Sequence, residues 1–184
     1  ENGQLEEIGY FDRDKRVKHG KKHHENGQLE ETGNYENGKK TGLWHEYYSN
    51  GKLLSVVNYE NGEENGESKT FYHEGQLFIN SNYVNGKLNG KIEKYYKNGQ
   101  LARTGHFENN KKSGEWQEFY ENGQLNTLEN YHEDQENGEW KKYHTTGQLL
   151  FLINFKVGKL SGEYLQNYEN GQLKVKGNFN SEGL

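Results

Sequence analysis

Hydrophobic and polar positions alternate along this chain in short stretches that return every 24 residues. Each copy carries the motif Asn-Gly-Gln-Leu or a close variant, and the glycines of this motif serve as anchors: Gly3, Gly27, Gly51, Gly75, Gly99, Gly123, Gly147 and Gly171. The second residue after each anchor is always Leu, and the eighth is always aromatic. This unbroken period predicts a repeat protein with one structural unit per copy.

Two stretches of each copy predict β-strands. Residues 29–35 and 42–48 of one copy alternate with period two, and neither has the 3.6-residue spacing of a helix. We therefore expect an all-β fold, an elongated single-layer antiparallel β-meander of about 15 strands built from eight hairpin repeats in one array over residues 1–184. The alternative is a parallel β-solenoid with one coil per copy, against which the Asn-Gly turns argue.

The turns and the register follow from the same pattern. Asn-Gly pairs at the anchors, such as Asn50-Gly51, Asn98-Gly99 and Asn122-Gly123, predict two-residue type I′ turns, in which both residues need a positive φ. The other connection, which joins the two strands of one copy, is predicted to be a longer loop, for example residues 36–41. The resulting rows close without slippage and place large rings beside glycines, such as Trp116 beside Gly105 and Tyr35 beside Gly42. The opposite face, where the seventh residue after the anchor is Asn in six copies, is expected to be exposed to solvent.

Composition fits a thin sheet better than a thick core. Leu, Ile, Val and Phe make up roughly a fifth of the chain and the mean hydropathy is −1.32, yet 14 Tyr and 3 Trp argue against disorder. A run of about 18 apolar residues is absent, so the sequence predicts a soluble chain without a transmembrane helix. The net charge of −5 argues against nucleic acid as a partner. The chain opens inside a motif, at Glu1, so its N-terminus looks trimmed and its localisation stays unknown.

Catalytic and metal-binding motifs are not found in the sequence. It contains no nucleophile elbow, no His-Glu-x-x-His and no phosphate loop, and it has no cysteine. We expect no enzyme activity, no cofactor and no small-molecule substrate. His23 and His24 are adjacent in a predicted strand and would point to opposite faces, so we interpret them as ring substitutes at aromatic positions rather than as metal ligands.

The best candidate for partner binding is the row of rings along one face. Its residues are Trp44, Tyr48, Tyr72, Tyr96, Trp116, Tyr120, Trp140 and Tyr168, with Glu129 between two of the tryptophans. The rings could form the protein's own core or a binding surface, since aromatic residues are enriched at binding hot spots. We interpret them as core residues with binding as a second use. Glu129 is either an interruption of the row or a polar contact inside a groove.

Residues 12–24 depart from the repeat and are rich in basic side chains. The basic residues are Arg13, Lys15, Arg16, Lys18, Lys21 and Lys22, and Lys18 stands where the repeat predicts glycine. One interpretation is a degenerate terminal repeat that caps the array. The other is an electrostatic docking site for an acidic partner or anionic lipid. The cap is the favoured interpretation.

The segment from Tyr35 to Trp44, followed by Glu46 to Leu53, resembles the MORN repeat (membrane occupation and recognition nexus). It is most similar to the bacterial variant of this repeat, whose members are often labelled as antitoxins. The resemblance covers essentially the whole chain. It implies a β-repeat fold and a role as an interaction platform, a dimerisation scaffold or a lipid-associated module.

These observations together predict a non-enzymatic scaffold. We expect it to bind another protein, or a second copy of itself, through an extended aromatic-lined sheet surface. One alternative, suggested by the labels of the bacterial relatives, is an antitoxin or immunity protein that neutralises a toxin. Another is a peripheral membrane-associated module, for which the basic residues of segment 12–24 are the support.

Overall fold

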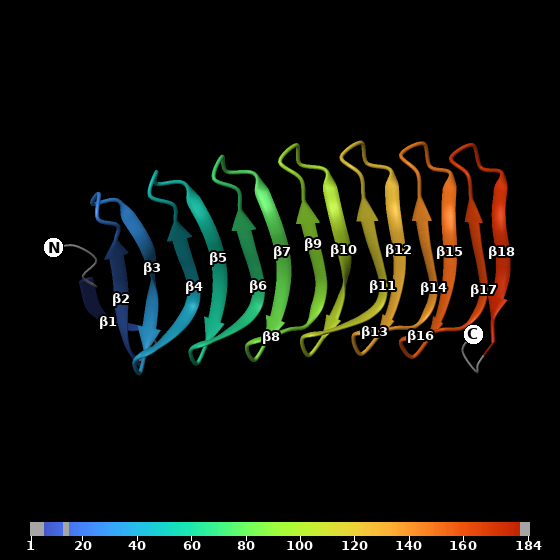
Figure 1. Ribbon diagram of the computed structural model, residues 1–184. Coiled ribbons are helices and arrows are strands. Elements are labelled where there is room, and N and C mark those ends of the chain that lie inside the picture. Colours follow the sequence, from blue (N-terminus) through green and yellow to red (C-terminus); the bar gives the residue numbers. More distant parts are fainter. Residues whose placement is uncertain (1–5, 13–14, 181–184) are drawn as a thin grey trace. The chain divides into compact units, whose positions relative to one another are not determined.

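The structure, a computed structural model, describes residues 6–12 and 15–180, with side chains described from Lys18 on. The chain divides into two compact units, Glu1–Leu88 and Asn89–Leu184. Every regular element of the described residues is a β-strand (Figure 1). Unit 1 contains β1 (Glu6–Asp12), β2 (Lys15–His23), β3 (Leu29–Glu36), β4 (Lys39–Tyr47), β5 (Leu53–Glu60), β6 (Glu63–Phe71), β7 (Leu77–Val84) and β8 (Lys87–Leu88). Unit 2 contains β9 (Gly90–Tyr95), β10 (Leu101–Glu108), β11 (Lys111–Phe119), β12 (Leu125–His132), β13 (Gln135–Glu136), β14 (Gly138–Tyr143), β15 (Leu149–Lys156), β16 (Lys159–Leu160), β17 (Gly162–Asn167) and β18 (Leu173–Phe179).

Within each unit, neighbouring strands of the chain pair antiparallel, except that β12 pairs with both β13 and β14, and β15 pairs with both β16 and β17. The prediction of an all-β antiparallel meander is therefore confirmed. The described residues form 18 segments rather than about 15 strands, because in three copies a two-residue segment, β8, β13 or β16, precedes the second strand and is separated from it by one residue, Asn89, Asn137 or Ser161. Each unit is a repeat array by itself, and the single array of residues 1–184 stays a prediction.

The anchor Asn-Gly pairs do not form type I′ turns, so that prediction is wrong. Gly51 has a φ of 80°, but Asn50 is not among the residues with positive φ. The Gly51 N–H donates to the Tyr48 carbonyl and the Tyr48 N–H donates to the Lys52 carbonyl, both at 2.8 Å. Residues 49–51 thus form a three-residue hairpin loop that ends on a left-handed glycine. The same pair of bonds closes the loops at Gly27, Gly75, Gly99, Gly123, Gly147 and Gly171.

The two-residue type I′ turns lie instead at the connection that was expected to be longer. Asn61 and Gly62 have φ values of 53° and 88°, and the flanking residues Glu60 and Glu63 pair directly. Both central residues are left-handed, as the type I′ turn demands. The equivalent left-handed pairs are Asn37-Gly38, Asn85-Gly86, Asn109-Asn110, Glu133-Asp134 and Val157-Gly158.

One of these turns has a residue that is poorly suited to it. Val157 has a φ of 49° and is 58% exposed, and a β-branched residue in the left-handed region is strained. We expect Val157→Asn to raise the free energy of unfolding by about 1 kcal/mol, because Asn tolerates this conformation. Urea denaturation measures the change, with Val84→Asn, an exposed strand position, as the control. A Val157→Asn protein no more stable than wild type would contradict the strain argument.

A bulge follows each type I′ turn and explains the apparent length of that connection. Between Asn34 and Thr32 of β3 the facing strand β4 advances four residues, from Thr41 to His45, so β4 carries two extra residues. Gly42 lies in this bulge with a φ of 66°, and the second glycines of the other described copies, Gly66, Gly90, Gly114, Gly138 and Gly162, also have positive φ.

The predicted register is right for some residue pairs and wrong for others. Between copies, Trp44 faces Val57 and Gly42 faces Tyr59, as expected. Leu53 pairs with Tyr47, however, rather than with the residue after it, because the register shifts between Glu46 and Tyr47. Within a copy Tyr35 faces Lys40, so its expected pairing with Gly42 is wrong, as is the expectation that the rows close without slippage.

The asparagines seven residues after the anchors hold these bulges in place. The Asn130 side-chain amide donates to the Glu139 carbonyl at 2.9 Å, and the Asn130 carbonyl accepts from the Asn137 N–H at 2.9 Å. The Asn154 side chain makes the same bond to the Glu163 carbonyl at 2.8 Å. These residues had been expected only to face water, and the structure gives them a structural role.

Candidate functional site

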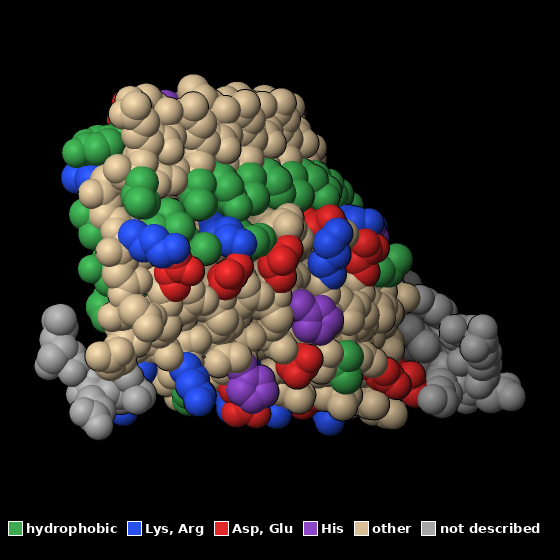
Figure 2. Space-filling view, turned by 90° about the vertical axis from the view of Figure 1, so that its right-hand side faces the viewer, with side chains coloured by type: hydrophobic (Ala, Val, Ile, Leu, Met, Phe, Trp, Pro, Cys, Tyr) green, Lys and Arg blue, Asp and Glu red, His purple; other side chains and the backbone are tan. Residues whose placement is uncertain are grey.

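The repeat places like side chains in rows across the strands. On the side of the molecule in view, hydrophobic side chains gather in a band, and acidic and basic side chains follow one another in a row beside it (Figure 2). Each unit has a face that carries its tryptophans. In unit 2 its residues are Arg103, Lys112, Trp116, Glu118, Glu129, Tyr131 and Trp140. In unit 1 they are Glu31, Lys40, Trp44, Glu46, Tyr59 and Glu64. We call this face of each unit the tryptophan face.

The two buried tryptophans lie flat on glycines. An ideal Cβ on Gly33 would lie 2.3 Å from Cδ2 of Trp44, and one on Gly105 would lie 2.1 Å from Cδ2 of Trp116. The contact predicted between Trp116 and Gly105 is confirmed, and the rings leave only 1% of Trp44 and 3% of Trp116 exposed. Such buried rings form the core of a thin sheet and offer a partner little area.

Aromatic neighbours complete the enclosure of each tryptophan. Tyr35 packs edge-on against Trp44 with ring centroids 4.8 Å apart, and Phe107 packs edge-on against Trp116 at 5.0 Å. The indole N–H groups of Trp44 and Trp140 each donate to a backbone carbonyl at 3.1 Å. The buried N–H of Trp116 makes no such bond in the described part of the chain.

Charged side chains cover the ring of Trp116. The guanidinium carbon of Arg103 lies 4.9 Å from the ring centroid, and the ammonium of Lys112 lies 5.0 Å from it. Burial, followed by the charge of Arg103, lowers the pKa of Lys112 below its ordinary value. Two cations thus share one aromatic surface, as cation–π attraction permits.

Glu129 balances these cations with a largely buried carboxylate. Its carboxylate lies 3.5 Å from a terminal nitrogen of Arg103 and accepts hydrogen bonds from the hydroxyls of Tyr131 at 3.0 Å and Thr127 at 3.3 Å. Only 14% of its side chain is exposed. Burial, then the charge and hydrogen bond of Glu129, raises the pKa of Tyr131. Arg103 also pairs with Glu118 at 3.4 Å, so the site is a fixed network over an aromatic floor.

Unit 1 repeats this arrangement with a different charge balance. Lys40 lies 4.0 Å above the ring of Trp44 and 3.0 Å from the carboxylate of Glu31. Ser55 donates to the carboxylate of Glu46 at 3.0 Å. Burial, followed by the charge of Glu46, raises the pKa of Glu64. The same positions therefore carry different charges in different copies.

The tyrosines of the candidate row contribute to the fold through their hydroxyl groups. Tyr48, Tyr96 and Tyr120 each donate to a backbone carbonyl 23 residues further on, at 2.7 to 2.8 Å. His24 occupies the same position in its copy, and its Nε2 lies 2.8 Å from the Tyr47 carbonyl. The interpretation of His24 as a ring substitute is supported by this contact. Tyr168 is exposed and Tyr72 is half-buried.

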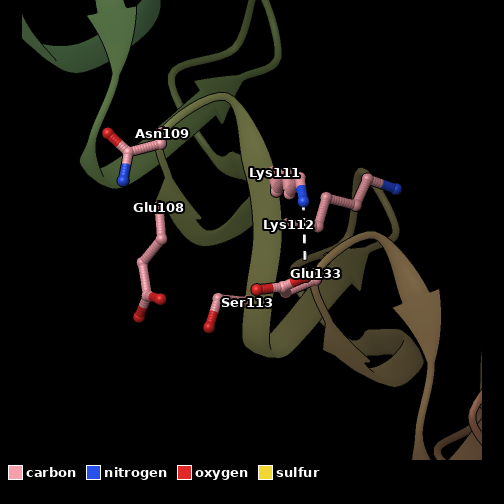
Figure 3. Close-up of a pocket in the computed structure, with 6 residues that line it drawn as sticks. All are labelled: Glu108, Asn109, Lys111, Lys112, Ser113 and Glu133. Carbon is pink, nitrogen blue, oxygen red and sulfur yellow. Dashed lines mark hydrogen bonds and ion pairs between the residues drawn. The ribbon is translucent and has the colours of Figure 1, made fainter.

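A small hollow of about 150 Å³ lies between two turns of unit 2 (Figure 3). Its lining residues are Glu108, Asn109, Lys111, Lys112, Ser113 and Glu133. The ammonium of Lys111 lies 3.3 Å from the carboxylate of Glu133, and the Lys112 N–H donates to the Asp134 carboxylate at 2.7 Å. These two contacts tie neighbouring turns together across the hollow.

A family model described as a MORN repeat variant matches seven segments of the chain, residues 17–37, 40–61, 64–85, 88–109, 112–133, 136–156 and 160–181. The chain belongs to the MORN repeat variant family. Between residues 37 and 160 the boundaries of the matched MORN segments fall at the type I′ turns, so one family repeat holds a second strand, a three-residue loop and the next first strand.

Comparison with other proteins adds little to this assignment. Curated proteins give no match to this MORN repeat chain. A solved structure titled "Crystal Structure of TcdB2-TccC3-TEV" is 14% identical with a TM-score of 0.28, and the match covers 91% of this chain. The chain spans only 12% of that larger one, and the low TM-score leaves the likeness without weight.

The basic residues of the MORN array lie partly outside the described side chains. Arg13 lies outside the described residues, and the side chains of Lys15 and Arg16 are not described. Lys22 forms an ion pair with Glu30 at 2.5 Å. Among the described residues no group of three His, Cys, Asp or Glu side chains could hold a metal ion. Within the same part of the chain, no helix has the length and apolar character needed to cross a membrane.

Proposed function

We propose that this MORN repeat protein is a non-enzymatic scaffold that binds another protein along its tryptophan face. The observation that carries the proposal is the network of Arg103, Lys112, Glu118 and Glu129 above the ring of Trp116. Binding hot spots are rich in Arg, Trp and Tyr, and complementary charges fix the register of a partner. The buried tryptophans form the floor, and the charged side chains and half-buried tyrosines above them make the contacts.

Family membership supports the scaffold part of this proposal, since the repeat builds an extended sheet surface rather than a closed pocket. The variation of charge between copies supports recognition. Glu31, Glu46 and Glu64 surround Tyr59 in unit 1, whereas Arg103 and Lys112 face Glu129 in unit 2. Within unit 1, Lys40 and Glu64 occupy the same position of successive copies, so a partner that crosses the strands would meet a different charge in each copy, which gives specificity.

The test compares two pairs of charge-neutralising changes. Arg103→Gln with Glu129→Gln alters the tryptophan face, whereas Glu139→Gln with Lys141→Gln alters an ion pair of 2.6 Å that flanks Trp140 on the opposite face. We expect photo-crosslinking in cell extract to recover a partner bound across the tryptophan face of wild type and of the control, and at least about tenfold less with the first pair. Thermal melting checks that both variants fold. Equal recovery with all three proteins, or crosslinks confined to the opposite face, would overturn the proposal.

A further inference from the structure

The turns of this array contain many Asn-Gly pairs, and this dipeptide can undergo an intramolecular reaction that converts its asparagine. The backbone nitrogen of the glycine loses its proton to solvent and attacks the side-chain carbonyl carbon of the asparagine. The amide nitrogen leaves as ammonia and a five-membered succinimide ring forms. Water then opens the ring at either carbonyl and yields aspartate or isoaspartate, so one water is consumed and one ammonia is released. We propose that the type I′ turns of unit 1, among them Asn61-Gly62 and Asn85-Gly86, are sites of this modification in the folded protein.

The three-residue loops restrain both reacting groups. The Oδ1 of Asn50 accepts from the Lys52 N–H at 3.0 Å, and its Nδ2 lies 3.1 Å from the ring of His73. The attacking nitrogen, that of Gly51, donates to the Tyr48 carbonyl at 2.8 Å. Asn26, Asn98 and Asn122 repeat this pattern, each held by the N–H two residues on and by a carbonyl of the next loop. Reaction at these sites requires all of these bonds to break.

The type I′ turns restrain only the glycine. The Gly62 N–H donates to the Lys40 carbonyl at 2.9 Å, and the Gly86 N–H donates to the Glu64 carbonyl at 2.9 Å. In the part of the chain that the structure describes, the exposed amide groups of Asn61 and Asn85 make no side-chain hydrogen bond. The electrophilic carbon and the leaving group are therefore free to turn toward the glycine nitrogen once one bond has opened.

The same turns differ between the two units. The described type I′ turns of unit 2 carry Asn109-Asn110, Glu133-Asp134 and Val157-Gly158, so none of them is an Asn-Gly pair. Unit 1 carries Asn-Gly at each described type I′ turn. Isoaspartate would add a methylene to the main chain at the first turn residue and disrupt the pairing of Glu60 with Glu63. Aspartate would add a negative charge beside the same two carboxylates.

The experiment ages the full folded chain at mildly alkaline pH and follows each Asn-Gly peptide by mass spectrometry, with enzymatic methylation to detect isoaspartate. We expect Asn61 and Asn85 to convert about tenfold faster than Asn50 and Asn122, the factor that two additional hydrogen bonds impose on a rate. In denaturant the four rates should converge, because the sequence around each site is the same Asn-Gly pair.

A control variant separates the effect of the side-chain bonds from that of sequence. His73→Ala removes one partner of Asn50 and should speed conversion at Asn50 while leaving Asn122 unchanged. Equal rates at Asn50 and Asn61 in the folded protein would overturn the proposal. Conversion in denaturant with no conversion at Asn61 or Asn85 in the folded chain would overturn it as well.

Discussion

Gly105→Ala is expected to lower the free energy of unfolding by about 3 kcal/mol, the upper end of the usual cost of overpacking. The new methyl group would lie 2.1 Å from Cδ2 of Trp116 and 2.3 Å from Cε2. The indole ring cannot move away, because Phe107 contacts one edge and Arg103 and Lys112 lie over its face. Urea denaturation followed by circular dichroism measures the loss.

The same substitution in a protein without the indole ring tests whether Trp116 causes the loss of stability. In copy 51–74 the same two positions hold Val57 and Ser68, which pair directly and are both buried, so a larger residue is tolerated when the ring is absent. In a Trp116→Ser protein, Gly105→Ala should therefore be neutral, or stabilising by about 0.5 kcal/mol as for Gly to Ala in a strand. An equal loss in both backgrounds would show that the backbone at Gly105, and not the ring of Trp116, rejects the methyl group.

The contact between Gly105 and Trp116 could be predicted from the sequence, because the small and the large residue stand at fixed distances from the anchor glycine and the predicted register places them beside each other on neighbouring strands. The 24-residue period and the two alternating stretches likewise led to the antiparallel hairpins. These features depend on side chains that repeat in every copy, and repetition makes a weak local signal strong.

The bulges could not be found in the same way, because they also recur in every copy and leave the period intact. Two extra residues around Gly42 shift the register within a copy, so alternation counted from the anchor misplaces Tyr35. A usable signal was present at Asn61-Gly62, an Asn-Gly pair inside the connection that was expected to be longer. A type I′ turn there would have left two residues unpaired in the following strand, and that excess is the bulge.

The charged network on the tryptophan face depends on contacts that cross more than one strand. Arg103 lies in β10 and Glu129 lies in β12, and they meet at 3.5 Å across β11. Pairwise register predicts neighbours on adjacent strands, so it could place Glu129 between two tryptophans but could not give it this partner. The length of the arginine side chain decides the contact.

The largest loss is expected for Trp44→Ala, at about 3 to 5 kcal/mol, the range for removing a buried aromatic side chain. Trp44 is the most deeply buried large side chain of the described residues, at 1% exposed. Its removal would leave Gly33 uncovered and take away the hydrogen bond from its indole N–H to the Asn34 carbonyl. Lys40 would also lose the ring beneath its ammonium. Thermal and urea unfolding followed by circular dichroism measure the effect.

The neighbouring residue Leu43 provides the matched control. It is 57% exposed, and Leu43→Ala should change stability by less than about 0.5 kcal/mol. Trp44→Phe should fall between the two, because it keeps a ring over Gly33 but loses the hydrogen bond to Asn34. If Trp44→Ala were as mild as Leu43→Ala, the ring would not be a core residue, and it would return to the set of exposed anchors for a partner. A loss in the expected range would instead confirm that Trp44 belongs to the core of the sheet.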